Sequence, residues 1–418
     1  MRTFVIGAGA SKAYQNSPTN CTMPIANDFF ETFTKLDICE DLRVLVGDIT
    51  NIGKNDFNIS IFNFFASGID IEDFFTHVEN KLLKQMEEGK IQDNIYYYKS
   101  YLQLIFLFTS IINEIQNGPV SKAHTNLIKS LKKDDTIITF NWDTLLDRAL
   151  SENTTWKTDF GYCLKPEKIY KNKWVKPIEN QHQNFNKLIK LHGSTNWITT
   201  YPMPHNQDLF KLNQKIDNSS FYIYENTVKP YHCYDGRYKG PYQPFSYFYY
   251  PPNILDDIAL DESNEKEMVK LGVLNNPEAQ KIYEKMLGIK LDLPIKTELD
   301  DGVITMPLII PPVKDKKYTL FANLFTDLWD IAKQEIVKSE EIVIIGYSFP
   351  KTDTKTIQLF KEAFCMKKEL PRIIIVNPEP NDIINLFEFT FGIPRNNIIV
   401  FKEYFDENFN FEKLESKG

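Results

Sequence analysis

The sequence lacks the cysteine pattern of a zinc-binding or disulfide-bonded protein. Its five cysteines are Cys21, Cys39, Cys163, Cys233 and Cys365. No two of them form a Cys-x-x-Cys pair, and an odd number of scattered thiols does not indicate a disulfide framework. We therefore expect a reducing, cytoplasmic compartment and no bound metal.

Long apolar runs and an excess of positive charge are also lacking. The longest apolar stretch, Leu102–Ile112, is too short to cross a bilayer, and the opening residues predict a strand and a glycine turn rather than a secretory signal. The net charge is −8, which gives no general attraction to nucleic acid or to an anionic membrane. We expect neither as a direct partner.

The apolar residues of the 418-residue chain are enough for a large core, since they make up 42% of it. Short, fully apolar runs predict buried strands of a parallel sheet. They are Thr3–Ile6, Thr136–Thr139, Leu188–Leu191, Ile342–Ile345 and Ile373–Val376. Turn residues and helical patterns follow most of them, which is typical of α/β proteins. The sequence predicts a Rossmann-like sheet with helices on both faces.

Two segments interrupt this pattern. A mostly helical insertion spans about 36–134, with its clearest helices at Glu72–Met86 and Tyr96–Ile115. From 200 to 317 the β/α alternation disappears and Tyr and Pro become frequent, as in Tyr247–Tyr250. We therefore expect one Rossmann-like domain made of 1–199 and 318–418, with 200–317 as an insertion or small subdomain.

A glycine-rich turn follows the first predicted strand. It contains Gly7, Ala8, Gly9 and Ser11. Glycine lets the backbone approach a pyrophosphate closely, and a helix N-terminus presents N–H groups to it. Gly-x-Gly alone is a weak signal, but its place between a strand and a predicted helix favours a dinucleotide site.

Polar residues close the next two strands. Asn141 and Asp143 follow Thr136–Thr139, where ligands of open α/β sheets bind; the alternative is that they cap a helix over 144–150. His192 closes the strand Leu188–Leu191 and precedes Gly193 and Ser194. Its ordinary pKa suits a general base, although a lone histidine is more often structural.

Two further turns follow later strands. Gly346 and Ser348 come after Ile342–Ile345, and Asn377 comes after Ile373–Val376. Each is a weak signal when taken alone. In order along the chain, the five motifs are GAGAS, TFNWD, KLHGS, IIGYS and VNP.

This ordered set resembles the sirtuin family, and more closely its bacterial branch of NAD-consuming effectors of anti-phage defence. The resemblance covers roughly 1–35, 135–200 and 318–402. It implies that the loop of Gly7, Ala8, Gly9 and Ser11 holds the NAD pyrophosphate. It further implies that Asn141 and Asp143 lie beside the nicotinamide and its ribose, and that His192 is the general base.

The resemblance also assigns the later motifs to NAD binding. Gly346 and Ser348 match a turn at the adenosine ribose and phosphate, and Asn377 matches a polar strand end beside the adenosine. Ser194, in the histidine motif, is placed with the same group.

The chain departs from deacylating sirtuins in two ways. It lacks their zinc-binding cysteines, and its stretch Cys21–Asp28 has no arginine where they carry a Gly-Ile-Pro-Asp-Phe-Arg segment. With the peptide-binding features missing, water is favoured as the acceptor, and the expected activity is NAD glycohydrolysis. Two alternatives stay open: a protein deacylase or ADP-ribosyltransferase, and a non-catalytic nucleotide sensor that controls a partner.

An enzyme that depletes NAD needs control, and no second sensory motif is visible. We therefore expect a homo-oligomer or a partner protein; the resemblance implies a HerA-type ATPase. The aromatic residues around Tyr247–Tyr250 predict an interface within 200–317. The alternative is that they fill a small core of that segment.

Overall fold

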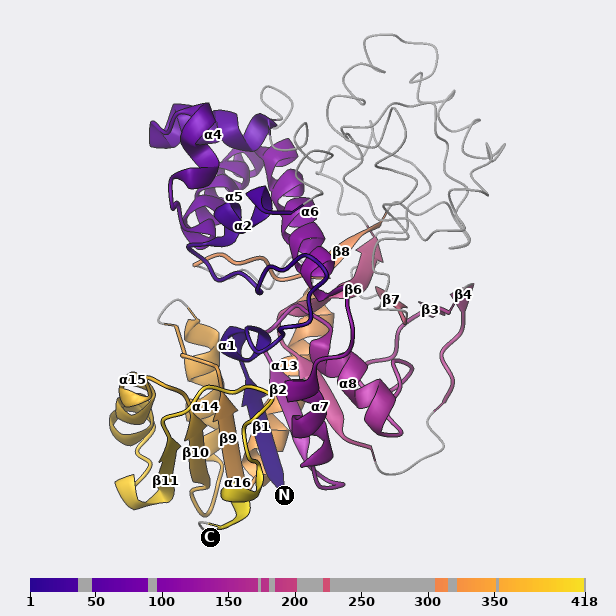
Figure 1. Ribbon diagram of the computed structural model, residues 1–418, viewed down its shortest axis with the longest axis vertical. Coiled ribbons are helices and arrows are strands. Elements are labelled where there is room, and N and C mark those ends of the chain that lie inside the picture. Colours follow the sequence, from indigo (N-terminus) through magenta and orange to yellow (C-terminus); the bar gives the residue numbers. More distant parts are fainter. Residues whose placement is uncertain are drawn as a thin grey trace.

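The computed structural model describes residues 1–36, 47–88, 96–171, 174–179, 185–200, 221–225, 305–314, 322–350 and 353–416. A parallel sheet lies at one end of the molecule, and a layer of helices lies at the other (Figure 1). Strands β6 (Gly193–Thr200) and β8 (Thr305–Ile309) of a second sheet lie between them. The candidate site lies where the parallel sheet meets this middle layer.

The parallel sheet has six strands in the order β11-β10-β9-β1-β2-β5. They are β1 (Arg2–Ile6), β2 (Thr136–Thr139), β5 (Lys187–Lys190), β9 (Glu341–Ile345), β10 (Arg372–Val376) and β11 (Ile398–Phe401). All their pairings are parallel. The five strands predicted from apolar runs are confirmed, and β11 is one more than the sequence predicted.

The strand order reverses next to β1. The first three strands run outward from the centre on one side, and the last three run outward on the other. This is the dinucleotide-binding order, whose ligands bind beyond the strand ends at the reversal between β1 and β9.

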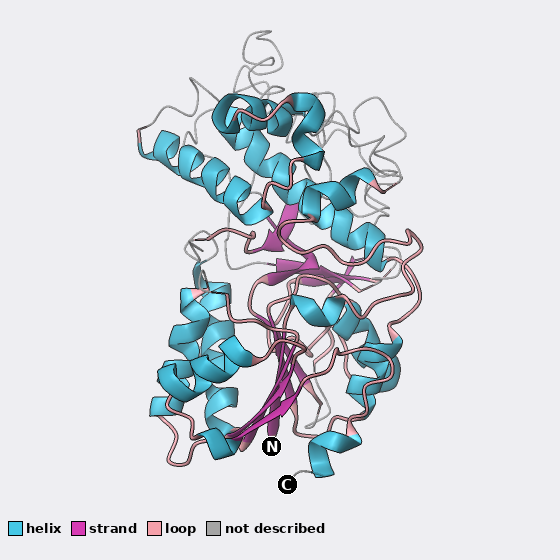
Figure 2. Cartoon of the chain, turned by 60° about the vertical axis from the view of Figure 1, so that its left-hand side comes forward, coloured by secondary structure: helices cyan, strands magenta, loops and turns pink. Residues whose placement is uncertain are grey.

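Helices cover both faces of the parallel sheet (Figure 2). They include α1 (Ala8–Ser11), α7 (Lys122–Lys129), α8 (Leu145–Asn153), α13 (Ala322–Lys338), α14 (Thr354–Cys365) and α15 (Asn381–Asn385). Helix α7 packs against α8, and α13 packs against α14. The predicted Rossmann-like fold is thereby confirmed. Shorter elements complete this part of the chain: η4 (Leu386–Thr390), η5 (Arg395–Asn397) and α16 (Glu412–Ser416).

The predicted helical insertion forms the layer above. From the predicted range it contains α4 (Gly47–Phe57), η1 (Ile61–Ala66), α5 (Ile71–Glu87) and α6 (Tyr96–Gln116). Helix α2 (Phe29–Thr34) precedes that range and packs against η1, whereas α7 falls within it but packs against α8 beside the parallel sheet. The core of the layer is a cluster of phenylalanine rings; Phe30 lies 4.9 Å from Phe64 and 5.7 Å from Phe74, centroid to centroid. Within the described residues, no helix has both the length and the apolar character to cross a membrane.

The second sheet was not predicted. Its order is β4-β3-β7-β6-β8, with β3 (Lys168–Tyr170), β4 (Trp174–Val175), β6 (Gly193–Thr200), β7 (Phe221–Tyr224) and β8 (Thr305–Ile309). Strands β7 and β8 come from the segment 200–317 and pair with β6, so the described parts of that segment belong to the second sheet. The interface predicted around Tyr247–Tyr250 lies outside the described residues.

Candidate functional site

The carboxyl ends of the central strands lie in register. Ile6 pairs with both Thr139 and Ile345, and Thr139 pairs with Lys190. Asn141 and His192 each lie two residues beyond one of these paired positions, on neighbouring strands. The sheet therefore brings the glycine turn, Asn141 and His192 to one edge, as the sequence predicted.

Asn141 lies in a hydrogen-bonded group that we call the amide cluster: Ser11, Asn141 and Asp143. The Asn141 amide nitrogen donates to the Gly7 carbonyl at 2.9 Å and to the Ser11 hydroxyl at 2.8 Å. Ser11 donates in turn to Asp143 Oδ2 at 2.6 Å. Asn141 is only 5% exposed. A backbone carbonyl can only accept, so the amide nitrogen must face Gly7, which fixes the orientation of the side chain.

Asp143 has a second contact, which bears on the capping interpretation. Its Oδ1 accepts the N–H of Leu145 at 3.1 Å, at the start of α8. The carboxylate therefore contacts the first residue of α8 and orients Ser11 at the same time, although the N-cap residue of this helix is Thr144, whose side chain makes no capping hydrogen bond.

The glycines of the first turn pack against the turn after β9. A Cβ at Gly7 would come within 2.5 Å of Tyr347, and one at Gly9 within 2.9 Å of Gly346. The Gly9 N–H donates to the Gly346 carbonyl at 2.8 Å. Close packing between the two loops is therefore enough to require glycine at these positions, whether or not a ligand binds. Ala8 and Gly9 remain exposed, so solvent reaches the outer side of the turn.

His192 lies among rings and one carboxylate, a group that we call the imidazole cluster: Phe140, Trp142, His192 and Asp353. The His192 ring centroid is 5.3 Å from that of Phe140 and 5.6 Å from that of Trp142. His192 Nε2 lies 3.8 Å from Asp353 Oδ2, and the two side chains are 3% and 2% exposed. The imidazole is therefore held in a water-poor environment beside one acidic group.

The chain passes from one sheet to the other directly after His192. Gly193 has a φ of +79°, and a Cβ there would lie 2.2 Å from the Leu308 carbonyl oxygen. The segment after β8 closes over this turn, because the Ile310 N–H donates to the His192 carbonyl and the Trp142 indole donates to the Ile310 carbonyl, at 2.8 and 2.9 Å. Both the backbone conformation and the packing require glycine at 193.

Ser194 stabilises the loop that carries Asn141. Its hydroxyl is 3.3 Å from the Trp142 carbonyl oxygen, which also accepts the Thr195 N–H at 2.9 Å. Ser194 is buried. These contacts join the Asn141 and His192 strands beyond the end of the parallel sheet.

The remaining predicted residues, Gly346, Ser348 and Asn377, follow strands β9 and β10. Gly346 has a φ of +62° and packs on the first turn, whereas Ser348 is exposed. Asn377 is half-buried, its Oδ1 accepts the Glu379 N–H at 2.8 Å, and its strand is two strands away from β1. The structure therefore brings Gly346 to the first turn but does not bring Ser348 or Asn377 into either cluster.

A buried ion pair lies below the amide cluster. Lys190 Nζ is 3.1 Å from Asp147 Oδ2, and the same ammonium donates to the Asp143 carbonyl. Tyr162 donates to the other oxygen of Asp147. Burial, together with the charge of Asp147, raises the pKa of Tyr162 well above its ordinary value. Tyr162 therefore stays a neutral donor that anchors this network.

Two more groups near the site have shifted pKa values. Burial lowers the pKa of His124 to about 4, against the opposing charge of Asp143. Burial also lowers the pKa of Lys355 to about 8, against the opposing charges of Asp330 and Asp353. The Lys355 ammonium lies 4.6 Å from the Trp329 ring centroid. The imidazole cluster thus has a cation next to its only carboxylate.

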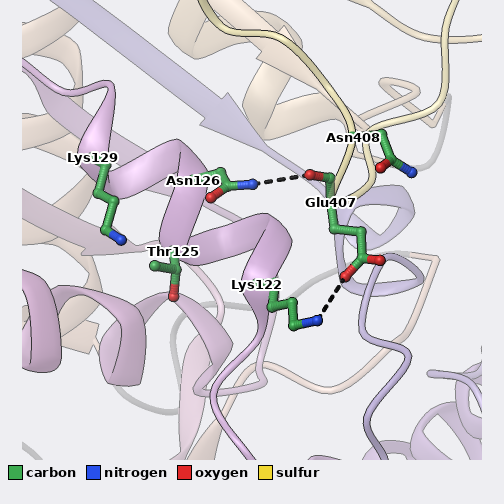
Figure 3. Close-up of a pocket in the computed structure, with 6 residues that line it drawn as sticks. All are labelled: Lys122, Thr125, Asn126, Lys129, Glu407 and Asn408. Atoms are coloured by element: carbon green, nitrogen blue, oxygen red, sulfur yellow. Dashed lines mark hydrogen bonds and ion pairs between the residues drawn. The ribbon is translucent and has the colours of Figure 1, made fainter.

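The pocket in Figure 3 lies elsewhere. It has a volume of about 320 Å³ between α7 and the segment around 407. Lys122 forms an ion pair with Glu407 at 3.6 Å, and Asn126 donates to the Glu407 carbonyl at 2.9 Å. None of the predicted site residues lines it. Its polar side chains join the C-terminal segment to α7.

Three of the five cysteines lie in the described residues. Cys21, Cys163 and Cys365 are free thiols, and Cys39 and Cys233 lie outside the described residues. In the parts of the chain that the structure describes, no three His, Cys, Asp or Glu side chains are grouped to hold a metal. The expectation of no bound metal stays a prediction.

Sequence reasoning missed Phe140, Trp142, Tyr347 and Asp353. The first three stand inside the motifs TFNWD and IIGYS, so their position beside polar site residues was a usable signal. Phe140 and Tyr347 stack at 4.2 Å with an interplanar angle of 9°. Asp353 had no such signal, because an aspartate before a helix ordinarily predicts a cap.

Comparison of the sequence with models of known protein families found no match, and comparison with curated proteins found none either. The family resemblance therefore rests on the five sequence motifs and stays a prediction.

Proposed function

We propose that this chain is an NAD glycohydrolase, which cleaves NAD to nicotinamide and ADP-ribose. The observation that carries the proposal is the arrangement at the carboxyl edge of the sheet. A glycine turn, the amide cluster and His192 lie together beside the strand-order reversal, where dinucleotides bind in this kind of sheet.

The reaction needs few groups. The bond between the nicotinamide nitrogen and the ribose C1′ breaks, and nicotinamide leaves with the electron pair as a neutral molecule. Water adds to C1′ and gives up a proton. His192 would take that proton, or one from a ribose hydroxyl, a role worth about 10²–10⁴-fold in rate.

The hydrogen bonds of Asn141 define what it would do. Both of its amide hydrogens are directed at protein acceptors, Gly7 and Ser11. Its Oδ1 is therefore the atom that would accept a hydrogen bond from the attacking water or a ribose hydroxyl. Ser11 and Asp143 would keep this oxygen in place, since they hold the other end of the amide.

The pyrophosphate would lie against the outer side of the first turn. Ala8 and Gly9 are exposed there, and the nearby Gly346 backbone keeps the two turns in contact. Direct binding by Ser11, Ser194, Gly346, Ser348 and Asn377 remains part of the proposal.

Biological context follows from the family resemblance. We propose on that basis that the chain is a cytoplasmic anti-phage effector that depletes NAD. It would act as a homo-oligomer under the control of a HerA-type ATPase.

The test is product analysis by mass spectrometry after incubation with NAD, with and without a HerA-type ATPase. Equal amounts of nicotinamide and free ADP-ribose are expected. Loss of acyl groups from a protein, or ADP-ribose attached to one, would instead favour a deacylase or transferase. NAD binding without any product under either condition would favour the nucleotide sensor.

A further inference from the structure

We propose that Asp353 is a positioning residue for His192. It would hold the imidazole with its hydrogen on Nε2, so that Nδ1 is the basic nitrogen. This inference rests on the proposed role of His192 as general base.

The first argument is the geometry of the pair. Asp353 Oδ2 lies 3.8 Å from His192 Nε2, and both side chains are almost fully buried. A carboxylate at this distance attracts an N–H dipole, and it attracts an imidazolium more strongly because that ring carries a full positive charge. Both attractions are strong here because little water screens the pair. Contacts between catalytic groups are often longer in ligand-free structures and shorten when substrate binds.

The second argument is the helix that Asp353 precedes. Asp353 is the N-cap residue of α14, yet its side chain makes no capping hydrogen bond. Instead, Asp353 Oδ2 accepts the hydroxyl hydrogen of Tyr347 at 2.7 Å. An aspartate at an N-cap ordinarily stabilises its own helix by about 1 kcal/mol. Here the carboxylate faces the imidazole cluster instead, which points to a role in that cluster.

The third argument is that the neighbouring rings fix the imidazole plane. Phe140 and Trp142 contact the His192 ring at interplanar angles of 64° and 30°. Rings can restrict the plane, but they cannot select which nitrogen carries the hydrogen. A hydrogen-bond acceptor does select it, and Asp353 is the acidic side chain placed at Nε2.

The test uses the full-length chain with histidine labelled by NMR-active nitrogen, and a His192→Gln variant to assign the signal. Long-range proton–nitrogen correlation reports which ring nitrogen carries the hydrogen. Wild-type His192 should carry it on Nε2. In Asp353→Asn, the amide can donate to Nε2, so the hydrogen should move to Nδ1. Asp353→Glu should restore the wild-type pattern.

Kinetics supply the second readout. Asp353→Asn should lower kcat about 10–100-fold with little change in KM, as expected for a residue that orients a base. Asp330→Asn is the matched control, because that carboxylate is 59% exposed on α13 and also interacts with Lys355. It should change neither the tautomer nor kcat. If Asp353→Asn fails to fold, Tyr347→Phe should show a smaller shift of the same kind.

The outcomes separate the two proposals. A wild-type imidazole with its hydrogen on Nδ1 would overturn the inference, and so would a folded Asp353→Asn variant with an unchanged tautomer. The expected tautomers in a chain that forms no ADP-ribose would support the Asp353–His192 contact and reject the hydrolase.

Discussion

The two halves of the candidate site are held by different forces. In the amide cluster, Asn141 is fixed by directional hydrogen bonds to Gly7 and Ser11. In the imidazole cluster, His192 is fixed by ring contacts and one carboxylate. Hydrogen bonds fix orientation sharply, whereas ring packing fixes position and tolerates small rotations. The two sides should therefore respond differently to substitution.

The largest effect is expected when the central residue of either side is removed. His192→Ala and Asn141→Ala should each leave a folded protein and lower nicotinamide release by about 10²-fold or more. Asn141→Ala should also cost about 1–3 kcal/mol of stability, because the Ser11 hydroxyl loses a buried partner. Turnover assays and thermal unfolding on both variants measure this. Near-wild-type turnover in either folded variant would remove that residue from the mechanism.

The turn after His192 should be the most sensitive backbone position on its side. In Gly193→Ala, the left-handed conformation costs about 1–2 kcal/mol, and the clash with the Leu308 carbonyl oxygen adds to it. Gly68 is the matched control, since its φ is +68° and nothing lies within 4 Å of an added Cβ. Denaturant unfolding should show a larger loss for Gly193→Ala than for Gly68→Ala. Equal losses would mean that β8 can shift to make room.

Acid should weaken folding through His124, which interacts electrostatically with Asp143 of the amide cluster. Burial lowers its pKa from 6.5 to about 4 in the folded protein. Between these values the unfolded chain binds a proton that the folded chain does not. The free energy of unfolding therefore falls as the pH drops from 6.5 to 4, by about 3 kcal/mol in total.

His124→Gln should remove that part of the pH dependence. Urea unfolding at a series of pH values measures it, and data at pH 8, where His124 is neutral in both states, give the reference. An unchanged slope in His124→Gln would show that other groups cause the acid sensitivity.

The smallest contrast is between two serines. Ser11→Ala removes the hydroxyl that links Asn141 to Asp143, so both stability and nicotinamide release should fall, the former by about 1–3 kcal/mol. Ser194→Ala removes only a 3.3 Å contact to the Trp142 carbonyl oxygen, and its effect should be under about 1 kcal/mol. Comparable losses in the two variants would show that the hydrogen-bonded side is no more constrained than the other.

Local patterns in the sequence were enough to predict the parallel sheet. Runs such as Ile342–Ile345 are apolar at every position because both faces of the sheet are covered. A short run of this kind therefore predicts a buried strand of a parallel sheet. The positions of Asn141 and His192 followed from the same patterns, since a residue after a buried strand must lie at the sheet edge. Strand β11 had a comparable run at Ile398–Phe401 that the prediction passed over.

The remaining features depend on contacts between distant parts of the chain. Strand β8 contains Pro307 and lies at an edge of its sheet, where proline is tolerated but weakens a strand prediction. Asp353 and His192 are 161 positions apart in the sequence (353 − 192) but lie side by side in the fold. No local motif predicts that contact. Likewise, Gly7 and Gly9 must be glycine because the turn after β9 packs against them, and only folding brings that turn near.

The turn at Gly193 has a mechanical consequence. His192 is the last residue before β6 of the second sheet, and its carbonyl accepts the N–H of Ile310 beyond β8. The segment after β8 continues to Lys314, whose N–H donates to Thr76 Oγ1 of α5 at 2.8 Å. A force that tilts the helical layer would therefore reach the turn that bears the imidazole through this segment. The same layer also reaches the loop that carries Asn141, since Phe108 of α6 lies 4.8 Å from Trp142, ring centroid to ring centroid, and Gln116 of α6 accepts the Thr144 N–H at 2.7 Å. Such a tilt would therefore act on both clusters.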